Sequence, residues 1–145
     1  MVKSLYQSWQ FWAGLAALFA ALTAILAKAA LDDLNSDYAT FLRTIVILLF
    51  LAAMLTMTGQ WQSLSGTGPK AIMLIIASGV ATGLSWLCYF RALKLGDASR
   101  VAPVDKLSVV LVAIFGTLLL GERLSAVNWL GILMIFGGVL LVALR

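Results

Sequence analysis

The chain has 145 residues, of which 63% are hydrophobic and 11% are charged, and its mean hydropathy is +1.05. A soluble domain carries about 25% charged residues, so the composition excludes a soluble globular protein and indicates an integral membrane protein. Histidine is absent, which excludes a zinc site with histidine ligands, a histidine proton relay and a Ser-His-Asp triad. The net charge of +4 is explained by cations that flank membrane helices, and nothing predicts nucleic-acid binding, a cofactor or a metal.

Five apolar runs are long enough to cross a bilayer, whose hydrocarbon core of about 30 Å needs roughly 20 helical residues. We therefore predict an all-α membrane protein, with residues 1–145 forming one domain of five transmembrane helices. An odd number of spans places the two termini on opposite sides of the membrane. The predicted spans are 8–31, 38–57, 71–95, 103–120 and 126–144.

Short polar segments separate these spans. The first, residues 31–37, is acidic, and Ser36 is a suitable N-cap for the second helix. The third segment is a predicted loop over 96–102, with Pro103 opening the fourth helix.

Most of the charge lies on one side of the predicted bundle, the side shared by the first loop, the third loop and the C-terminus. The positive-inside rule places that side in the cytoplasm. The other side holds Lys3, Lys70, Arg123 and Glu122. The crowded side, with the helix ends that approach it, holds Lys28, Arg43, Arg91, Lys94, Arg100, Lys106, Arg145, Asp32, Asp33, Asp37, Asp97 and Asp105.

Arg43 lies unusually deep for a membrane cation. If Ser36 caps the second helix, Arg43 is about 10 Å along the helix axis, and a guanidinium near mid-membrane costs about 2.5 to 3.5 kcal/mol. We expect it to face the bundle interior with a partner, for which Asp37, Asp105 and a bound anion remain open alternatives. Snorkelling to the interface better suits the cations in last helical turns, which are Lys28, Arg91 and Lys94.

Lys106 is the second unusual cation, because it would oppose the helix dipole in a first turn where Asp105 is favoured. The uncharged run 107–120 covers only about 21 Å, so both charges should dip towards hydrocarbon as a paired, partly buried ion couple. Glu122 is most simply a turn residue, with proton coupling as the alternative. Residues expected near the pair are Ser108, Tyr89, Trp86, Phe90 and Arg91.

At these residues the chain resembles the EamA domain of the drug/metabolite transporter superfamily, and more closely its small five-helix bacterial and archaeal branch. Two departures are Val109, where many EamA domains have proline, and Ala13 between Trp12 and Gly14, where many have a Trp-Gly pair. The features that carry the resemblance are Arg43, the run RALKLGDA at 91–98, Val-Ala-Pro at 101–103, Leu-Gly-Glu at 120–122, and Gly131 with Gly138.

Family members with ten helices contain two such units in inverted orientation, so the resemblance implies that this chain forms an antiparallel homodimer in a prokaryotic plasma (inner) membrane. Its partners would be membrane lipid, a second copy and a small-molecule substrate bound at the interface between repeats.

Small multidrug exporters of the superfamily bind cationic drugs through a glutamate in the first helix, where this chain has Lys28 and no carboxylate. We therefore expect an anionic or zwitterionic metabolite. The candidate coupling residues are Asp105 and Glu122. The candidate substrate-binding or ion-pairing residues are Arg43, Lys106, Asp105, Arg91, Lys28, Tyr89, Trp86 and Ser108.

Three functions remain open at this point. The first is a secondary transporter of a small polar metabolite that works by alternating access. The second is a non-transporting membrane subunit of a larger complex, such as a lipid-linked sugar flippase. The third is a membrane-embedded enzyme using Asp105, Glu122, Ser108 or Tyr89, but no acid/base pair or nucleophile-base spacing favours it.

Overall fold

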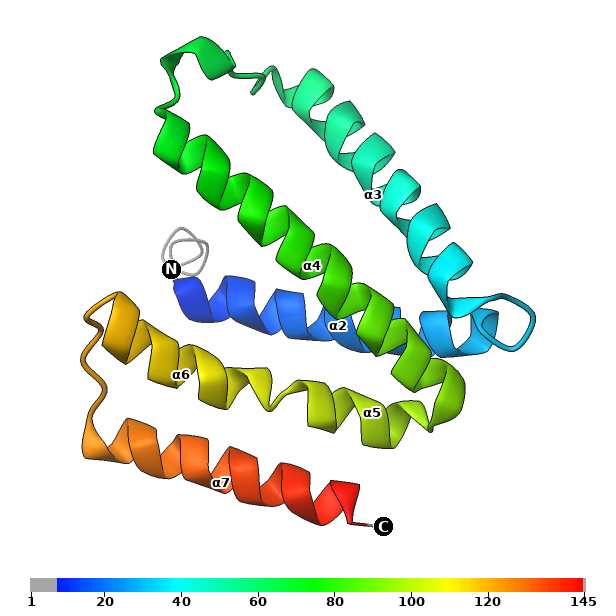
Figure 1. Ribbon diagram of the computed structural model, residues 1–145, viewed down its shortest axis with the longest axis vertical. Helices are drawn as coiled ribbons and strands as arrows, with labels where there is room; N and C mark the ends of the chain where they lie inside the picture. Colours follow the sequence, from blue (N-terminus) through cyan, green and yellow to red (C-terminus); the bar gives the residue numbers. More distant parts are fainter. Residues whose placement is uncertain (1–7, 145) are drawn as a thin grey trace. The chain divides into compact units, whose positions relative to one another are not determined.

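The computed structural model describes residues 8–144, and regular structure in that range is entirely helical. Five stretches are long and apolar enough to cross a membrane, which confirms the predicted all-α fold with five spans. One of them, Ala98–Leu119, is divided into two helices. The elements in Figure 1 are α2 (Trp9–Ala30), α3 (Ser36–Thr58), η1 (Leu64–Gly66), α4 (Pro69–Leu95), α5 (Ala98–Asp105), α6 (Ser108–Leu119) and α7 (Ala126–Ala143).

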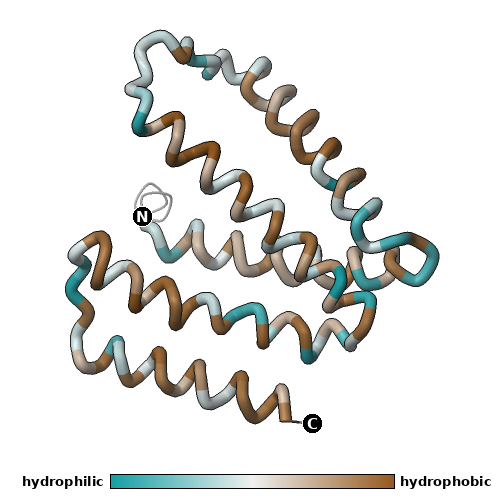
Figure 2. Tube along the Cα trace, in the orientation of Figure 1, coloured by the Kyte–Doolittle hydropathy of each residue, from teal (hydrophilic) through white to brown (hydrophobic). Residues whose placement is uncertain are grey.

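The long helices are apolar around most of their circumference. Figure 2 shows hydrophobic positions along most of α3, α4, α6 and α7, with hydrophilic ones at the loop before α3, the end of α4 and the α5–α6 junction. On α3 the residues Val46, Leu48, Leu49 and Phe50 are all exposed on the isolated chain. A helix that is hydrophobic all round belongs in a lipid environment, so the chain is a multi-pass membrane protein.

The chain divides into two compact units, and the first to consider is residues 26–95, here called the α3–α4 unit. Within it α3 and α4 run side by side in opposite directions, joined through η1 (Figure 1). Its buried side chains include Leu31, Ala39, Phe90 and Leu93. The core of this unit therefore gathers where the end of α2 and the start of α3 meet the end of α4.

The cap of α3 differs by one residue from the expected one. Asn35, rather than Ser36, is the N-cap, and its side-chain Oδ1 accepts hydrogen bonds from the backbone N–H groups of Asp37 and Tyr38. Asparagine and serine both satisfy free N–H groups at a helix start. Asn35 is the cap because its backbone is extended, whereas Ser36 is already the first residue of the helix. At its other end α3 stops at Gly59, which adopts the left-handed conformation with φ of 66°.

The second unit, here called the α5–α7 unit, comprises the described residues 8–25 and 96–144. In it α7 packs along both α5 and α6 (Figure 1). The buried positions of α6 are the small residues Ala113 and Gly116, and those of α7 are Ile132 and Val139. Small residues are common at the buried positions of membrane helices, and beside Gly116 lies the side chain of Glu122.

The fourth span begins earlier than predicted. Asp97 has an extended backbone and its carbonyl accepts from the N–H groups of Arg100 and Val101, so the helix starts at Ala98. The prediction of a loop over 96–102 was wrong because polar residues in a first helical turn resemble a loop in sequence. Pro103 consequently lies inside α5 instead of opening the helix.

Candidate functional site

Arg43 lies on α3, eight residues beyond the Asn35 cap, which places it about 12 Å along the helix. Its guanidinium carbon Cζ is 4.0 Å from the ring centroid of Trp86 and 5.4 Å from that of Phe90. Within the α3–α4 unit, no atom accepts a hydrogen bond from Arg43, and no carboxylate forms an ion pair with it. The aromatic faces are therefore its partners within that unit. Asp105 belongs to the other unit, so its pairing with Arg43 stays a prediction.

The two aromatic residues are placed by α4. Trp86 and Phe90 are four residues apart, so they share one face of that helix. Phe90 is 2% exposed and Trp86 is half-buried, so the packed end of the unit holds the rings in place. A cation over such a ring gains about 0.5 to 2 kcal/mol.

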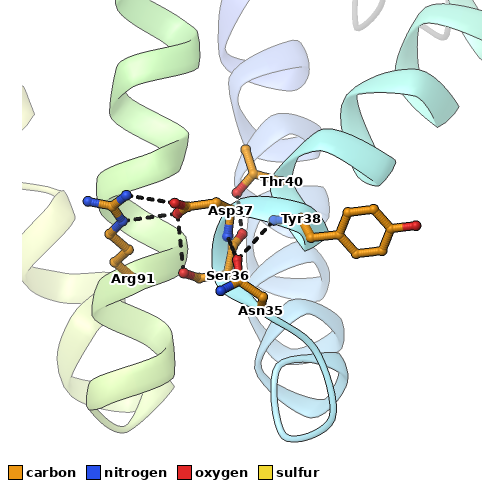
Figure 3. Close-up of polar contacts among 6 residues, drawn as sticks. All are labelled: Asn35, Ser36, Asp37, Tyr38, Thr40 and Arg91. Atoms are coloured by element: carbon orange, nitrogen blue, oxygen red, sulfur yellow. Dashed lines mark hydrogen bonds and ion pairs between the residues drawn. The ribbon is translucent and has the colours of Figure 1, made fainter.

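The alternative in which Asp37 pairs with Arg43 was wrong, because Asp37 pairs with Arg91. As Figure 3 shows, Arg91 on α4 reaches both carboxylate oxygens of Asp37 at the start of α3, while the ring of Tyr38 points away. Arg91 Nε donates to Oδ1 at 2.9 Å and Nη2 to Oδ2 at 2.6 Å. The side chains are 62% and 45% exposed on the isolated chain. This bidentate pair fastens α4 to α3.

Two lysines reciprocally cap the ends of α2 and α4. Lys28, in the last turn of α2, donates to the Leu93 carbonyl oxygen at 2.8 Å. Lys94, in the last turn of α4, donates to the carbonyl of Leu31, just beyond α2, with longer contacts to two further carbonyls of the loop. Cations are favoured at helix C-termini, where carbonyls lack helical partners. Both lysines are therefore engaged with backbone.

The Asp105–Lys106 pair lies at the junction between α5 and α6. The expected ion pair is present, with Lys106 Nζ 3.1 Å from Asp105 Oδ2, and the side chains of Lys106 and Asp105 are 55% and 35% exposed. The N–H groups of Lys106 and Leu107 donate to carbonyls three residues back, as do those of Val109 and Val110. The α-helical pattern is thus replaced by a tighter 3₁₀-type turn, which in mid-helix often marks a hinge.

The remaining candidates lie on α4, on α6 and just beyond α6. Tyr89 is on α4, one residue before Phe90, and Ser108 is the first residue of α6. Glu122 follows Gly121, which has φ of 71°, and its N–H donates to the Gly116 carbonyl at 3.1 Å. Glu122 therefore closes the end of α6, as expected of a turn residue.

The long-range partners were not predicted from the sequence. Asp37 was placed among the charges of the crowded side, but was not paired with Arg91, which lies 54 positions away. Phe90 was noted only as a neighbour of the expected site, and the backbone acceptors of Lys28 and Lys94 were not predicted. Helix-end position signalled the two lysines, but no spacing rule indicates which helix supplies the carbonyl. Among the described residues, no cluster of acidic or cysteine side chains is placed to hold a metal ion.

Comparison with known proteins finds relatives that are named as transporters or exporters. The chain is 59% identical over 137 residues to an uncharacterized transporter in the cobO 3′ region of a Sinorhizobium species, covering 94% of this chain and 97% of that protein. It is 30% identical over 146 residues to the pseudopaline exporter CntI of Pseudomonas aeruginosa, covering 98% of this chain and 49% of the exporter. It is also 30% identical over 134 residues to the uncharacterized transporter YxxF of Bacillus subtilis, covering 92% and 42%.

The chain thus spans almost all of the first relative and about half of each of the other two. No solved structure matches it. Residues 7–144 match the EamA-like transporter family, and the chain therefore belongs to that family.

Proposed function

We propose that this protein is a secondary transporter that moves a small anionic or zwitterionic metabolite across the membrane by alternating access, without enzyme chemistry. The observation that carries the proposal is Arg43, a guanidinium set into an apolar helix against two aromatic rings, with no acceptor within the α3–α4 unit. Family membership supplies the general activity, and Arg43 indicates the charge of the substrate.

An energy comparison favours a role for Arg43 in binding. Inserting an arginine near the helix centre costs about 2.5 to 3.5 kcal/mol, and the aromatic contacts return about 0.5 to 2 kcal/mol. Charged groups retained inside membranes are typically functional. A substrate anion that binds Arg43 would supply the missing interaction each time it enters the site.

The break between α5 and α6 supports the transport proposal independently. Transporters commonly use helices interrupted near the membrane centre, where free backbone groups and dipole ends lie beside the substrate or coupling ion. Here the interruption coincides with Asp105 and Lys106. We propose Asp105 as the coupling residue at this hinge, with Lys106 and Ser108 beside the substrate path.

We further propose that residues 1–145 form one transport unit and that two copies pair in antiparallel orientation in a prokaryotic plasma membrane. The chain covers 49% and 42% of two longer transporter relatives, so two copies approach the length of each. Five spans per chain would give inverted repeats when two copies insert in opposite directions.

Transport is tested with the purified chain in proteoliposomes, using a panel of radiolabelled carboxylic and amino acids and measuring uptake and counterflow. We expect flux of at least one compound, and Arg43→Ala should reduce it about 100-fold or more, since unpairing a buried charge costs about 2 to 5 kcal/mol. Lys70→Ala is the matched control, because Lys70 lies 16 residues before Trp86 on α4. Equal flux in the Arg43→Ala variant would reject the proposed site, and no flux from the purified chain would favour a subunit role.

Orientation is tested with single cysteines in a Cys88→Ala background. Asp33→Cys lies in the loop before α3 and Gln62→Cys lies in the connection after it, and both positions are exposed. A membrane-impermeant thiol reagent on intact cells should label each variant partially if the chain inserts both ways. Complete labelling at one position and none at the other contradicts the antiparallel homodimer.

A further inference from the structure

We infer that Arg43 binds a single carboxylate group of the transported molecule, and that Trp86 and Phe90 are positioning residues that fix the plane of its guanidinium. The inference narrows the proposed function to ligands that present one singly charged, planar anionic group. Its physiological meaning rests on that function, but the binding chemistry is testable without transport.

The charges at this end of the α3–α4 unit favour a ligand that carries a single negative charge. Arg91 is paired with Asp37, and Lys28 and Lys94 are held on backbone carbonyls. Arg43 is thus the cation of this group without a hydrogen-bond or ion-pair partner within the α3–α4 unit. One positive charge is in excess overall, since the group comprises the four cations Lys28, Arg43, Arg91 and Lys94 and the three carboxylates Asp32, Asp33 and Asp37.

A single excess charge favours a monoanion over a dianion. A carboxylate would neutralise Arg43 and leave this group of residues without net charge. A phosphate monoester is mostly doubly charged above its second pKa of about 6, and a dicarboxylate also carries two charges. Either would bring one uncompensated charge into a medium where ion desolvation is costly.

The aromatic contacts favour a planar ligand group at the edge of the guanidinium. Guanidinium presents its N–H donors in a flat fork that matches the two oxygens of a carboxylate. Rings at 4.0 and 5.4 Å from Cζ restrict how that fork rotates. Because Phe90 is buried, the fork is held in place before the ligand arrives, which lowers the entropic cost of binding.

The test measures binding to purified wild-type protein in detergent at pH 8, using benzoate, terephthalate, phenyl phosphate and the neutral analogue benzamide at constant ionic strength. Dissociation constants come from the rise of the thermal unfolding midpoint with ligand concentration. We expect benzoate to bind about tenfold or more tightly than either dianion, and benzamide to produce no shift. Equal or tighter binding of a dianion, or no shift with any anion, overturns the inference.

Variants separate recognition from a loss of folding. Arg43→Ala should abolish the benzoate shift, and Arg43→Lys, which keeps the charge but loses the fork, should weaken binding about tenfold. Trp86→Leu should narrow the preference for benzoate over phenyl phosphate, whereas Trp86→Phe should retain most of it. Lys70→Ala should bind as wild type, and each variant must elute as a single folded species. Unchanged benzoate binding in folded Arg43→Ala rejects the inference.

The outcomes distinguish this inference from the proposed transport function. Benzoate binding that depends on Arg43, in a protein that moves none of the panel compounds in proteoliposomes, supports the carboxylate site and rejects transport. Measurable flux together with benzoate binding that is independent of Arg43 rejects the carboxylate site and supports transport.

Discussion

The short polar contacts of the two units, those of about 3 Å or less, differ in how far apart their partners lie in sequence. In the α3–α4 unit, Arg91 meets Asp37 across 54 positions and Lys28 meets the Leu93 carbonyl across 65. In the α5–α7 unit, the ion pair joins the adjacent residues Asp105 and Lys106. Arg100 and the Ala143 carbonyl, 43 positions apart, are 3.5 Å from each other, at the outer limit of a hydrogen bond. Contacts between distant residues fix helices against one another, whereas contacts between neighbours do not.

This difference indicates different mechanical roles. In the α3–α4 unit, polar bonds join the end of α2, the start of α3 and the end of α4 around the core residues Phe90 and Leu93. At the α5–α6 junction the ion pair joins two adjacent residues, Asp105 and Lys106, so it does not tie one helix to another. There 3₁₀-type hydrogen bonds replace the α-helical ones. We interpret the α3–α4 unit as a rigid frame for Arg43 and the α5–α6 junction as a hinge. If so, substitutions in the frame should lower the free energy of unfolding more than substitutions at the hinge.

The largest effect is expected at the lysine caps. Lys94→Met keeps the apolar stem but removes the donor to the Leu31 carbonyl and its neighbours, so the free energy of unfolding should fall by about 2 kcal/mol. Lys28→Met, which removes one bond, should cost about 1.5 kcal/mol. Unfolding is followed in mixed micelles with increasing SDS. Arg100→Met is the control, because the one hydrogen bond that Arg100 donates from its side chain within residues 8–144 is a 3.5 Å contact with the Ala143 carbonyl. An equal loss of stability in Arg100→Met would contradict the proposal that the lysine caps hold a rigid frame.

A smaller effect is expected from the ion pair between α3 and α4. Asp37→Asn and Arg91→Gln should each lower the unfolding midpoint by less than Lys94→Met does, because both side chains are well exposed on the isolated chain. The double variant should resemble either single variant, since the bidentate pair is lost only once. Asp33→Asn, in the exposed loop, should not change the midpoint. Additive losses in the double variant would show that the pair does not couple the helices.

The sequence was sufficient for properties that depend on local composition. Apolar length predicted the five spans, and the depth of Arg43 within an apolar run was enough to single it out as an unusual cation. The short uncharged run 107–120 likewise predicted that Asp105 and Lys106 pair, because both charges would otherwise approach hydrocarbon alone. These predictions required no knowledge of how helices pack.

The sequence was insufficient where packing selects among equal alternatives. Asp37 was a reasonable partner for Arg43, but the approach of α4 brings Arg91 to it instead. The start of the fourth span was misplaced because Ser99 and Arg100 in a first helical turn resemble loop residues. The distance between α3 and α4 decides which cation pairs with Asp37. The extended backbone of Asp97 decides where the fourth span begins.

A still smaller effect is expected at the α5–α6 junction. In a double-mutant cycle with Asp105→Asn and Lys106→Gln, the coupling energy should be no more than about 0.5 kcal/mol, because the pair is local and partly exposed. The same micelle assay measures it, with the Asp37–Arg91 cycle as reference. A coupling larger than that of the reference would mean that the junction is fastened and does not serve as a hinge.

The smallest effect is expected at the far end of α6. A Cβ atom at Gly116 would lie 2.6 Å from Oε2 of Glu122, so Gly116→Ala must displace that carboxylate. The side chain is exposed and flexible, so it should swing away, and the helix-propensity gain of alanine, about 0.5 to 1 kcal/mol, should leave the net change within about 0.5 kcal/mol. Gly121→Ala is the matched control, since its φ of 71° makes alanine cost about 1 to 2 kcal/mol. If Gly116→Ala is as costly as Gly121→Ala, the Glu122 carboxylate is held in place. That result would favour the alternative in which Glu122 takes part in proton coupling over a role in the turn alone.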